Sequence, residues 1–182
     1  MRMRRFPGSG LLFDLASQRV DAYARETPAL DLRHYLDGPV SASGLFIGLS
    51  GHVQRRFTIE MTGRWSGSHG RLEERFRYDD GETGERFWEM VVGEGGTLTA
   101  TANDVLGAAK GAQSGNAAAM RYRLRVPRKA GATVVRIEDW FYLIDDGTLI
   151  NRARMSWFGL KVGEIVACFR RGGAAGPRIG QP

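Results

Sequence analysis

The stretch Glu138–Phe158 reads EDWFYLIDDGTLINRARMSWF and decides the fold. Two segments rich in aromatic and β-branched residues flank the triplet Asp145-Asp146-Gly147. Glycine adopts the positive φ that a tight turn requires, and aspartate bonds its own backbone in such turns. The stretch therefore predicts an antiparallel hairpin and indicates an all-β protein, but it does not name a reaction.

The composition is that of a single globular domain. Of the 182 residues, 42% are hydrophobic and 25% are charged, which is ordinary for a soluble protein. The 25 glycines are about twice the average share of roughly 7%, and their scatter predicts many turns. The single cysteine, Cys168, excludes an internal disulfide and a cysteine-based metal cluster.

Hydrophobicity alternates with a period of two from Val40 onward, as in half-buried antiparallel strands. The links between these segments are short and include no long crossover. The pattern predicts an antiparallel up-and-down barrel of about 8–10 strands, because closure removes exposed edges. The nine expected strands cover residues 44–49, 52–65, 71–78, 86–92, 97–102, 118–126, 133–144, 148–157 and 161–170.

The N-terminal part has helical spacing instead. Apolar residues over 11–23 predict an amphipathic helix that Pro28 stops, and a second short helix is predicted over 30–36. We expect one or both helices to pack outside the barrel. The predicted organisation is an N-terminal extension over 1–26, the barrel domain over 27–170 and a disordered tail over 171–182.

The first five residues, MRMRR, resemble the charged start of a signal peptide, but no apolar run of about 7 or more residues follows. No stretch is long and apolar enough to span a membrane. As it stands, the sequence predicts a cytoplasmic, soluble protein. A shortened version of an exported protein is the alternative.

Several blocks resemble, in order, a bacterial family catalogued as domain of unknown function 3833, from about Tyr23 to Arg170. They include LDLRHYLDGP at 30–39, ANDVLGAAKG at 102–111, DWFYLID at 139–145 and LINR at 149–152. The resemblance implies a lipocalin-like barrel and a place in the cell envelope or periplasm. It also implies exported lipoproteins, whose lipid-bearing cysteine near the start is absent here, so membrane association would be peripheral. It implies no activity.

The expected interior is aromatic with a few polar groups, which is the usual make-up of a small-ligand site. Structural ion pairs at the barrel mouths are the alternative for the polar groups. Residues 133–144 are apolar on both faces, so an N-terminal helix or a dimer contact is expected to cover the outer face. The predicted ligand-binding residues of the interior are Arg55, Phe57, Phe76, Tyr78, Tyr122, Trp140, Tyr142, Asn151 and Trp157.

The Gly-rich segment 103–116 is predicted to be a long loop. Its Asp104, Lys110 and Asn116 are candidate ligands for a polar head group. The phosphate-loop pattern G-x-x-x-x-G-K-[ST] is absent, because no Ser or Thr follows Lys110. An ordinary flexible connection is the alternative.

No catalytic residue, metal site or cofactor is predicted. His34, His52 and His69 have no metal-ligand spacing, and no G-x-S-x-G elbow occurs. Glu74 and Glu138 become acid–base partners only if they share a pocket. The net charge of +6 indicates an acidic partner or an arginine-covered outer wall, and the wall is favoured over nucleic acid because the aromatics fall on opposite faces.

The leading hypothesis is a barrel that binds a small apolar or amphipathic molecule, with lipid among the candidates. An enzyme that uses carboxylates in the barrel pocket is the second hypothesis. A structural or assembly module of the bacterial envelope is the third. The sequence leaves open whether the chain is a monomer or a homodimer.

Overall fold

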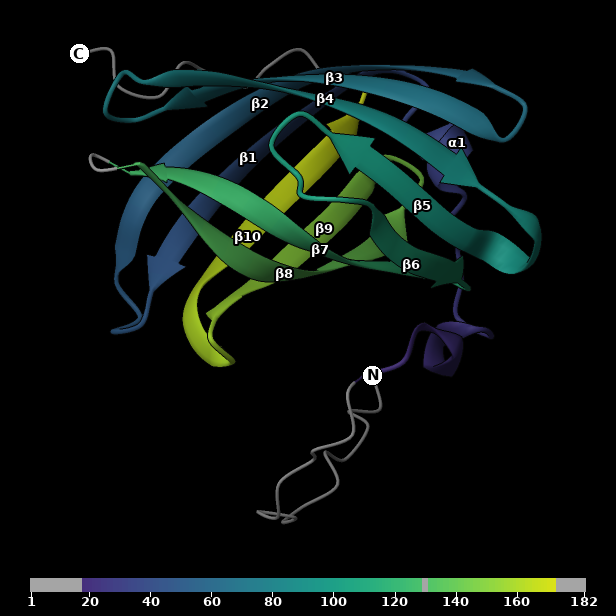
Figure 1. The fold of residues 1–182 in the computed structure, drawn as a ribbon. Coiled ribbons are helices and arrows are strands. Elements are labelled where there is room, and N and C mark those ends of the chain that lie inside the picture. The colour runs from purple at the N-terminus through teal and green to yellow at the C-terminus, as the bar shows by residue number, and fades with distance from the viewer. Residues whose placement is uncertain (1–17, 129–130, 173–182) are drawn as a thin grey trace, which may run out of the picture.

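The computed structural model describes residues 18–128 and 131–172. Ten antiparallel strands form a closed barrel in which each strand pairs with its neighbour in sequence and β1 pairs with β10 (Figure 1). This confirms the predicted up-and-down barrel. The strands are β1 (Gly38–Gly48), β2 (Val53–Ser66), β3 (His69–Tyr78), β4 (Thr83–Val92), β5 (Thr97–Ala102), β6 (Ala109–Ser114), β7 (Ala117–Arg128), β8 (Gly131–Asp145), β9 (Thr148–Trp157) and β10 (Leu160–Arg171).

The alternating sequence fills the barrel as expected. On β2, Phe57, Ile59 and Met61 are buried, whereas Arg56 and Glu60 are exposed to solvent. The same alternation on the other strands produces one continuous core inside the barrel. Burial of this apolar surface is the main force that stabilises the fold.

A short helix, α1 (Leu32–Tyr35), lies at the end of the barrel where β1 begins (Figure 1). Asp31 caps it by accepting a hydrogen bond from the Arg33 amide at 3.0 Å. The buried Tyr35 hydroxyl donates to the carbonyls of Gly147 and Phe169 at 3.0 and 3.1 Å. These contacts attach α1 to the β8–β9 turn and to β10. The second predicted helix is thus confirmed.

The first predicted helix is described only in part. Its last residues form a 3-10 turn, η1 (Val20–Tyr23), while residues 11–17 lie outside the described chain. None of the helices in the described ranges is long and apolar enough to cross a membrane. The predicted tail also lies outside the described residues, apart from Arg171 in β10 and Gly172.

The long loop predicted over 103–116 is wrong, because β6 occupies Ala109–Ser114. The small residues of this segment allow close strand pairing and do not mark a loop. A Cβ atom on Gly111 would lie 1.8 Å from the Ala119 carbonyl oxygen of β7. Glycine is therefore required where β6 and β7 approach each other.

The predicted faces of β8 are inverted. Trp140 and Tyr142 lie on the outer face, where their rings meet that of Tyr23 from η1 at 6.2 and 5.6 Å between centroids. Phe141 instead faces the cavity. Both faces of β8 are apolar, so the alternation alone did not decide which one points inward. An N-terminal segment does cover the outer face, as predicted.

Candidate functional site

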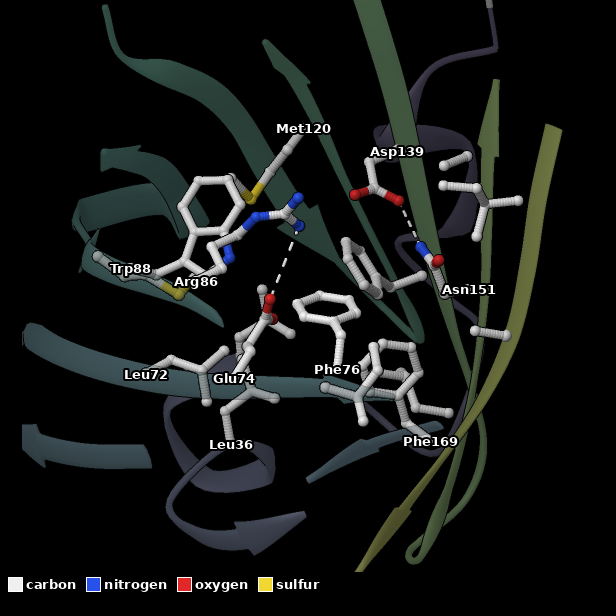
Figure 2. A pocket seen from close by; sticks show the side chains of 18 of the residues that line it. Leu36, Leu72, Glu74, Phe76, Arg86, Trp88, Met120, Asp139, Asn151 and Phe169 are labelled. Atoms are coloured by element: carbon white, nitrogen blue, oxygen red, sulfur yellow. Dashed lines mark hydrogen bonds and ion pairs between the residues drawn. The ribbon is translucent and has the colours of Figure 1, made fainter. Parts of the chain in front are cut away.

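A cavity of about 110 Å³ lies inside the barrel, and α1 contributes to its wall. Its surface is largely aromatic and aliphatic, with four polar side chains besides the tyrosine hydroxyl (Figure 2). The polar members are Glu74, Arg86, Asp139 and Asn151, together with Tyr122. The apolar members are Leu32, Leu36, Phe57, Ile59, Leu72, Phe76, Trp88, Met90, Met120, Phe141, Leu149, Ala153, Ile165, Ala167 and Phe169.

Glu74 of β3 and Arg86 of β4 form the first polar group. They are partners in the β3–β4 register, so both side chains point to the interior. Arg86 Nη1 lies 3.6 Å from Glu74 Oε2. Arg86 also donates from Nε and Nη2 to the carboxylate of Asp104, at 2.9 and 2.7 Å. These two donors of the planar guanidinium thus form a bidentate pair with Asp104.

Tyr122, Asp139 and Asn151 form the second polar group, on β7, β8 and β9. The Tyr122 hydroxyl donates to Asp139 Oδ2 at 3.0 Å. Asn151 Nδ2 donates to Asp139 Oδ1, and also to the Trp140 carbonyl at 3.1 Å. Figure 2 shows Asp139 and Asn151 across the cavity from Glu74 and Arg86.

Burial perturbs the carboxyl groups of both clusters. It raises the pKa of Glu74 from 4.5 to about 7, against the opposing effect of Arg86. It also raises the pKa of Asp139 from 3.8 to about 6, although the hydrogen bonds from Asn151 and Tyr122 act in the other direction. The pKa of Tyr122 lies well above its usual value for the same reason. Carboxyl groups whose pKa is shifted toward neutral pH are common in functional sites.

One oxygen of Glu74 lies in the 3.6 Å ion pair with Arg86 but has no hydrogen-bond partner among the described residues. Its Oε2 atom is buried and accepts no hydrogen bond from any described residue. Buried carboxylate oxygens are normally satisfied, because an unpaired one carries a desolvation penalty. This oxygen belongs to a side chain that lines the cavity, so a bound molecule can satisfy it.

The structure brings together four of the predicted interior residues. Phe57, Phe76, Tyr122 and Asn151 line the cavity. Tyr78 stacks 6.1 Å from Phe76, and the Arg55 guanidinium lies 3.7 Å above the Tyr78 ring. Arg55 itself donates to Asp80 at 2.7 Å and to Glu82 at 2.5 Å, as expected for an ion pair at the barrel mouth.

The other predicted residues lie elsewhere. Trp140 and Tyr142 are on the outer face of β8, as described above, and Trp157 is half-exposed at the end of β9. Lys110 is exposed on β6. Asn116 donates to the Leu143 carbonyl at 3.4 Å, and so stabilises the chain between β6 and β7. Of the predicted loop residues, only Asp104 reaches the site, through Arg86.

Arg86 and Asp139 were not among the predicted site residues. Arg86 lies two residues before Trp88, so both side chains point to the same face of a strand. The inward direction of Arg86 could therefore be predicted from the apolar Trp88. Asp139 lies in the interior because the inward face of β8 is the one that was predicted to point outward. Glu138, which was to act with Glu74 only if the two shared a pocket, lies outside the cavity and pairs with Arg121 at 2.7 Å.

No group of three or more His, Cys, Asp and Glu side chains in residues 18–128 and 131–172 is placed to hold a metal ion.

Comparisons with known proteins agree with this architecture. A family model described as "Protein of unknown function (DUF3833)" matches residues 10–171, which include the blocks that carried the resemblance. Among solved structures, the chain is similar to the S-type phycobiliprotein lyase CPES from Guillardia theta. The TM-score is 0.59 at 7% identity, over 87% of this chain and 99% of that chain. The fold is thus a lipocalin-like barrel. No curated protein matches the chain.

Proposed function

The chain belongs to the DUF3833 family of proteins of unknown function, and from its cavity we propose that it binds one small, mostly apolar molecule whose polar group donates hydrogen bonds. A protonated amine is the group that fits best. The observation that carries this proposal is the buried Glu74 Oε2 on the wall of the barrel cavity, which accepts no hydrogen bond from the described residues.

The charge around the cavity favours a donor over an anion. Glu74 and Asp139 line the cavity and Asp104 adjoins it through Arg86, which is the only cation among the described residues of the cavity wall. Two of the donor nitrogens of Arg86 already bind Asp104. A ligand carboxylate or phosphate would therefore meet excess negative charge, whereas an ammonium group would offset it.

The size of the cavity limits the ligand. A dry apolar cavity of about 150 Å³ accommodates benzene, so the smaller cavity of about 110 Å³ limits the ligand to at most a single ring or a short branched chain. A complete lipid chain would require side chains of the wall to move. The rings of Phe57, Phe76 and Trp88 favour a flat, apolar body.

The test is an NMR titration of the ¹⁵N-labelled protein with three molecules of the same shape: benzylamine, benzyl alcohol and benzoate. We expect benzylamine to bind most tightly and benzoate least. Glu74→Gln should weaken benzylamine binding about tenfold or more, since a hydrogen bond to a charged group contributes roughly 1.5–3 kcal/mol. Binding of benzyl alcohol should change much less.

Glu73→Gln is the matched control, because Glu73 is the neighbouring residue on the outer face and contacts Arg64 and Arg71. It should leave all three affinities unchanged. Tighter binding of benzoate than of benzylamine would overturn the preference for a donor. The absence of shifts at cavity residues with all three molecules, and with short-chain lipids, would overturn ligand binding in this barrel.

An enzyme that uses the same cavity is the second candidate. The observation in its favour is that two carboxyl groups, Glu74 and Asp139, share the cavity and both have a raised pKa. Such groups exchange protons readily near neutral pH. Conversion of a bound molecule by the native protein, abolished by Glu74→Gln but not by Glu73→Gln, would favour this candidate over simple binding.

A further inference from the structure

The exposed apolar side chains are concentrated at one end of the barrel. Among the described residues, eight large hydrophobic side chains are exposed, and six of them lie at the end opposite α1. Phe158, Leu160 and Leu49 are the most exposed, at 87%, 74% and 70%. The six residues are Leu49, Val53, Val134, Trp157, Phe158 and Leu160.

These six residues form one patch, because they lie on β2, β10, β9 and β8 or in the turns that follow β1 and β9, and these five strands are consecutive in the barrel. Leu49 follows the end of β1, which pairs with β10 through Gly48 and Gly163. Trp157 pairs with Leu160 across the β9–β10 turn. In Figure 1 the β1–β2 and β9–β10 turns lie at the lower left, whereas α1 lies on the right. We call the six residues the tip patch.

Phe158 occupies a position that favours glycine. Its φ is +47°, and it is the one non-glycine residue with positive φ in the described chain. Asn or Gly is usual at such a turn position, and a bulky residue is strained there. Phe158 is also almost fully exposed, so neither its conformation nor its burial stabilises the fold.

Arginines of β7 and β8 lie beside the tip patch on the outer wall. Arg123 of β7 and Arg136 of β8 face each other in the register, as Arg125 faces Val134. The nearby carboxylates of Glu138 and Glu164 pair with other residues, Arg121 and Arg152. Like charges directly opposite each other are destabilising in a sheet. No contact described for Arg123 and Arg136 within the fold explains why these arginines lie opposite each other.

We propose that this end of the barrel docks on an anionic lipid bilayer, with the tip patch in the membrane interface and Arg123 and Arg136 facing the lipid headgroups. Exposed aromatic and aliphatic side chains beside a basic surface are the features by which proteins lie on membranes. Tryptophan, present here as Trp157, is enriched at that depth because its ring is amphipathic. Basic residues add attraction to anionic lipids.

A second copy of the chain fits the tip patch less well. A symmetric contact through the tip patch would bring Arg123 and Arg136 of two protomers together. The carboxylates of Asp79, Asp80 and Glu82 at this end already pair with Arg55 and Arg56. The most protruding members of the tip patch, Leu49 and Phe158, lie in turns between strands and not on a flat sheet face. A bilayer supplies both an apolar layer for the turns and negative charge for the arginines.

The experiment is vesicle flotation with phosphatidylcholine vesicles and with vesicles that contain phosphatidylglycerol in addition. We expect binding to the anionic vesicles that weakens as salt increases. The double variant F158S/L160S should lower the partition coefficient about tenfold or more. R123Q/R136Q should lower it as well and should flatten the salt dependence.

Two matched variants serve as controls. Ile144→Ser removes an exposed apolar residue at the opposite end of the barrel, and Arg170→Gln removes an exposed arginine there. Neither should alter binding. Absence of flotation at low salt, equal binding to neutral vesicles, or self-association of the native protein that F158S/L160S abolishes would each overturn the proposal. Far-UV circular dichroism establishes that the variants are folded.

Discussion

At the scale of single residues, Glu74 is the most informative position of the molecule. Its carboxyl group is buried in an apolar wall, its Oε2 atom has no hydrogen-bond partner, and Arg86 Nη1 lies 3.6 Å away. Burial disfavours the charged form, and the nearby guanidinium only partly offsets that penalty. A group in this state stores free energy that a ligand can release.

The penalty predicts how stability depends on pH. Unfolding lowers the pKa of Glu74 from about 7 to its usual value of 4.5. Between these values the folded state holds a proton that the unfolded state has lost, so the free energy of unfolding falls as pH rises. Glu74→Gln removes this effect. Between about pH 5 and 8, the free energy of unfolding should decrease in both proteins. We expect the decrease to be smaller in the variant, by on the order of 1–3 kcal/mol.

Urea unfolding at several pH values, followed by tryptophan fluorescence, measures the effect. Asp139 acts in the same direction between pH 3.8 and about 6, so a smaller slope should persist in the variant. Glu73→Gln should retain the native slope, because Glu73 lies on the outer face. Parallel curves for Glu74→Gln and the native protein would contradict the assigned burial of this carboxyl group.

At the scale of elements, α1 is a plug for the barrel. Leu32 is among the largest fully buried side chains, and it lines the cavity. The backbone directly after α1 also approaches β2 closely, since a Cβ atom on Gly63 would lie 1.7 Å from the Leu36 carbonyl oxygen. The helix has only four residues, so packing and not helix propensity holds it in place.

Leu32→Ala tests this role. We expect a loss of about 2–5 kcal/mol in the free energy of unfolding, through lost burial and the enlarged cavity. Benzylamine should lose affinity relative to the longer phenethylamine, because the cavity gains length. His34→Ala, on the exposed side of α1, should change stability by less than about 0.5 kcal/mol. Equal effects of the two substitutions in a urea titration would show that α1 does not seal the cavity.

The elements also show what the sequence predicts and where it fails. The β8–β9 hairpin was predicted correctly, because its turn triplet and the apolar strands on either side of it are local signals. The faces of β8 were not, because both are apolar and the cover by Tyr23 is a tertiary contact. With the faces inverted, Asp139 was hidden as a surface residue and Trp140 was assigned to the interior.

The β6 segment failed for a different reason. The glycine and alanine residues in AKGAQS are typical of a loop. The sequence pattern does not show that the β7 backbone is so close that a Cβ atom on Gly111 would lie 1.8 Å from it. Arg86 and Asp104 come together for a similar reason, as their pairing joins β4 to the chain after β5. Local patterns thus predicted the strands, while the polar site depends on their register.

At the scale of the whole molecule, closure of the barrel joins the two ends of the domain. β1 and β10 pair over nine residue positions, from Val40 with Arg171 to Gly48 with Gly163. Every other pairing joins strands that are neighbours in sequence. The β1–β10 contact is therefore the one that closes the longest loop, and it removes the two edges that an open sheet would expose.

This closure predicts a single cooperative unit. If the β1–β10 contact is as integral as the hairpins, its amides exchange with solvent only when the whole barrel unfolds. Hydrogen exchange under native conditions should then give opening free energies for Ala42 and Ala167 within about 1 kcal/mol of those for Leu149 in the β8–β9 hairpin. Increasing urea should reduce all of them with the same slope. A much lower opening free energy at Ala42 and Ala167 would mean that the barrel opens at this junction, and such an opening would give a ligand a path to the cavity without passing α1.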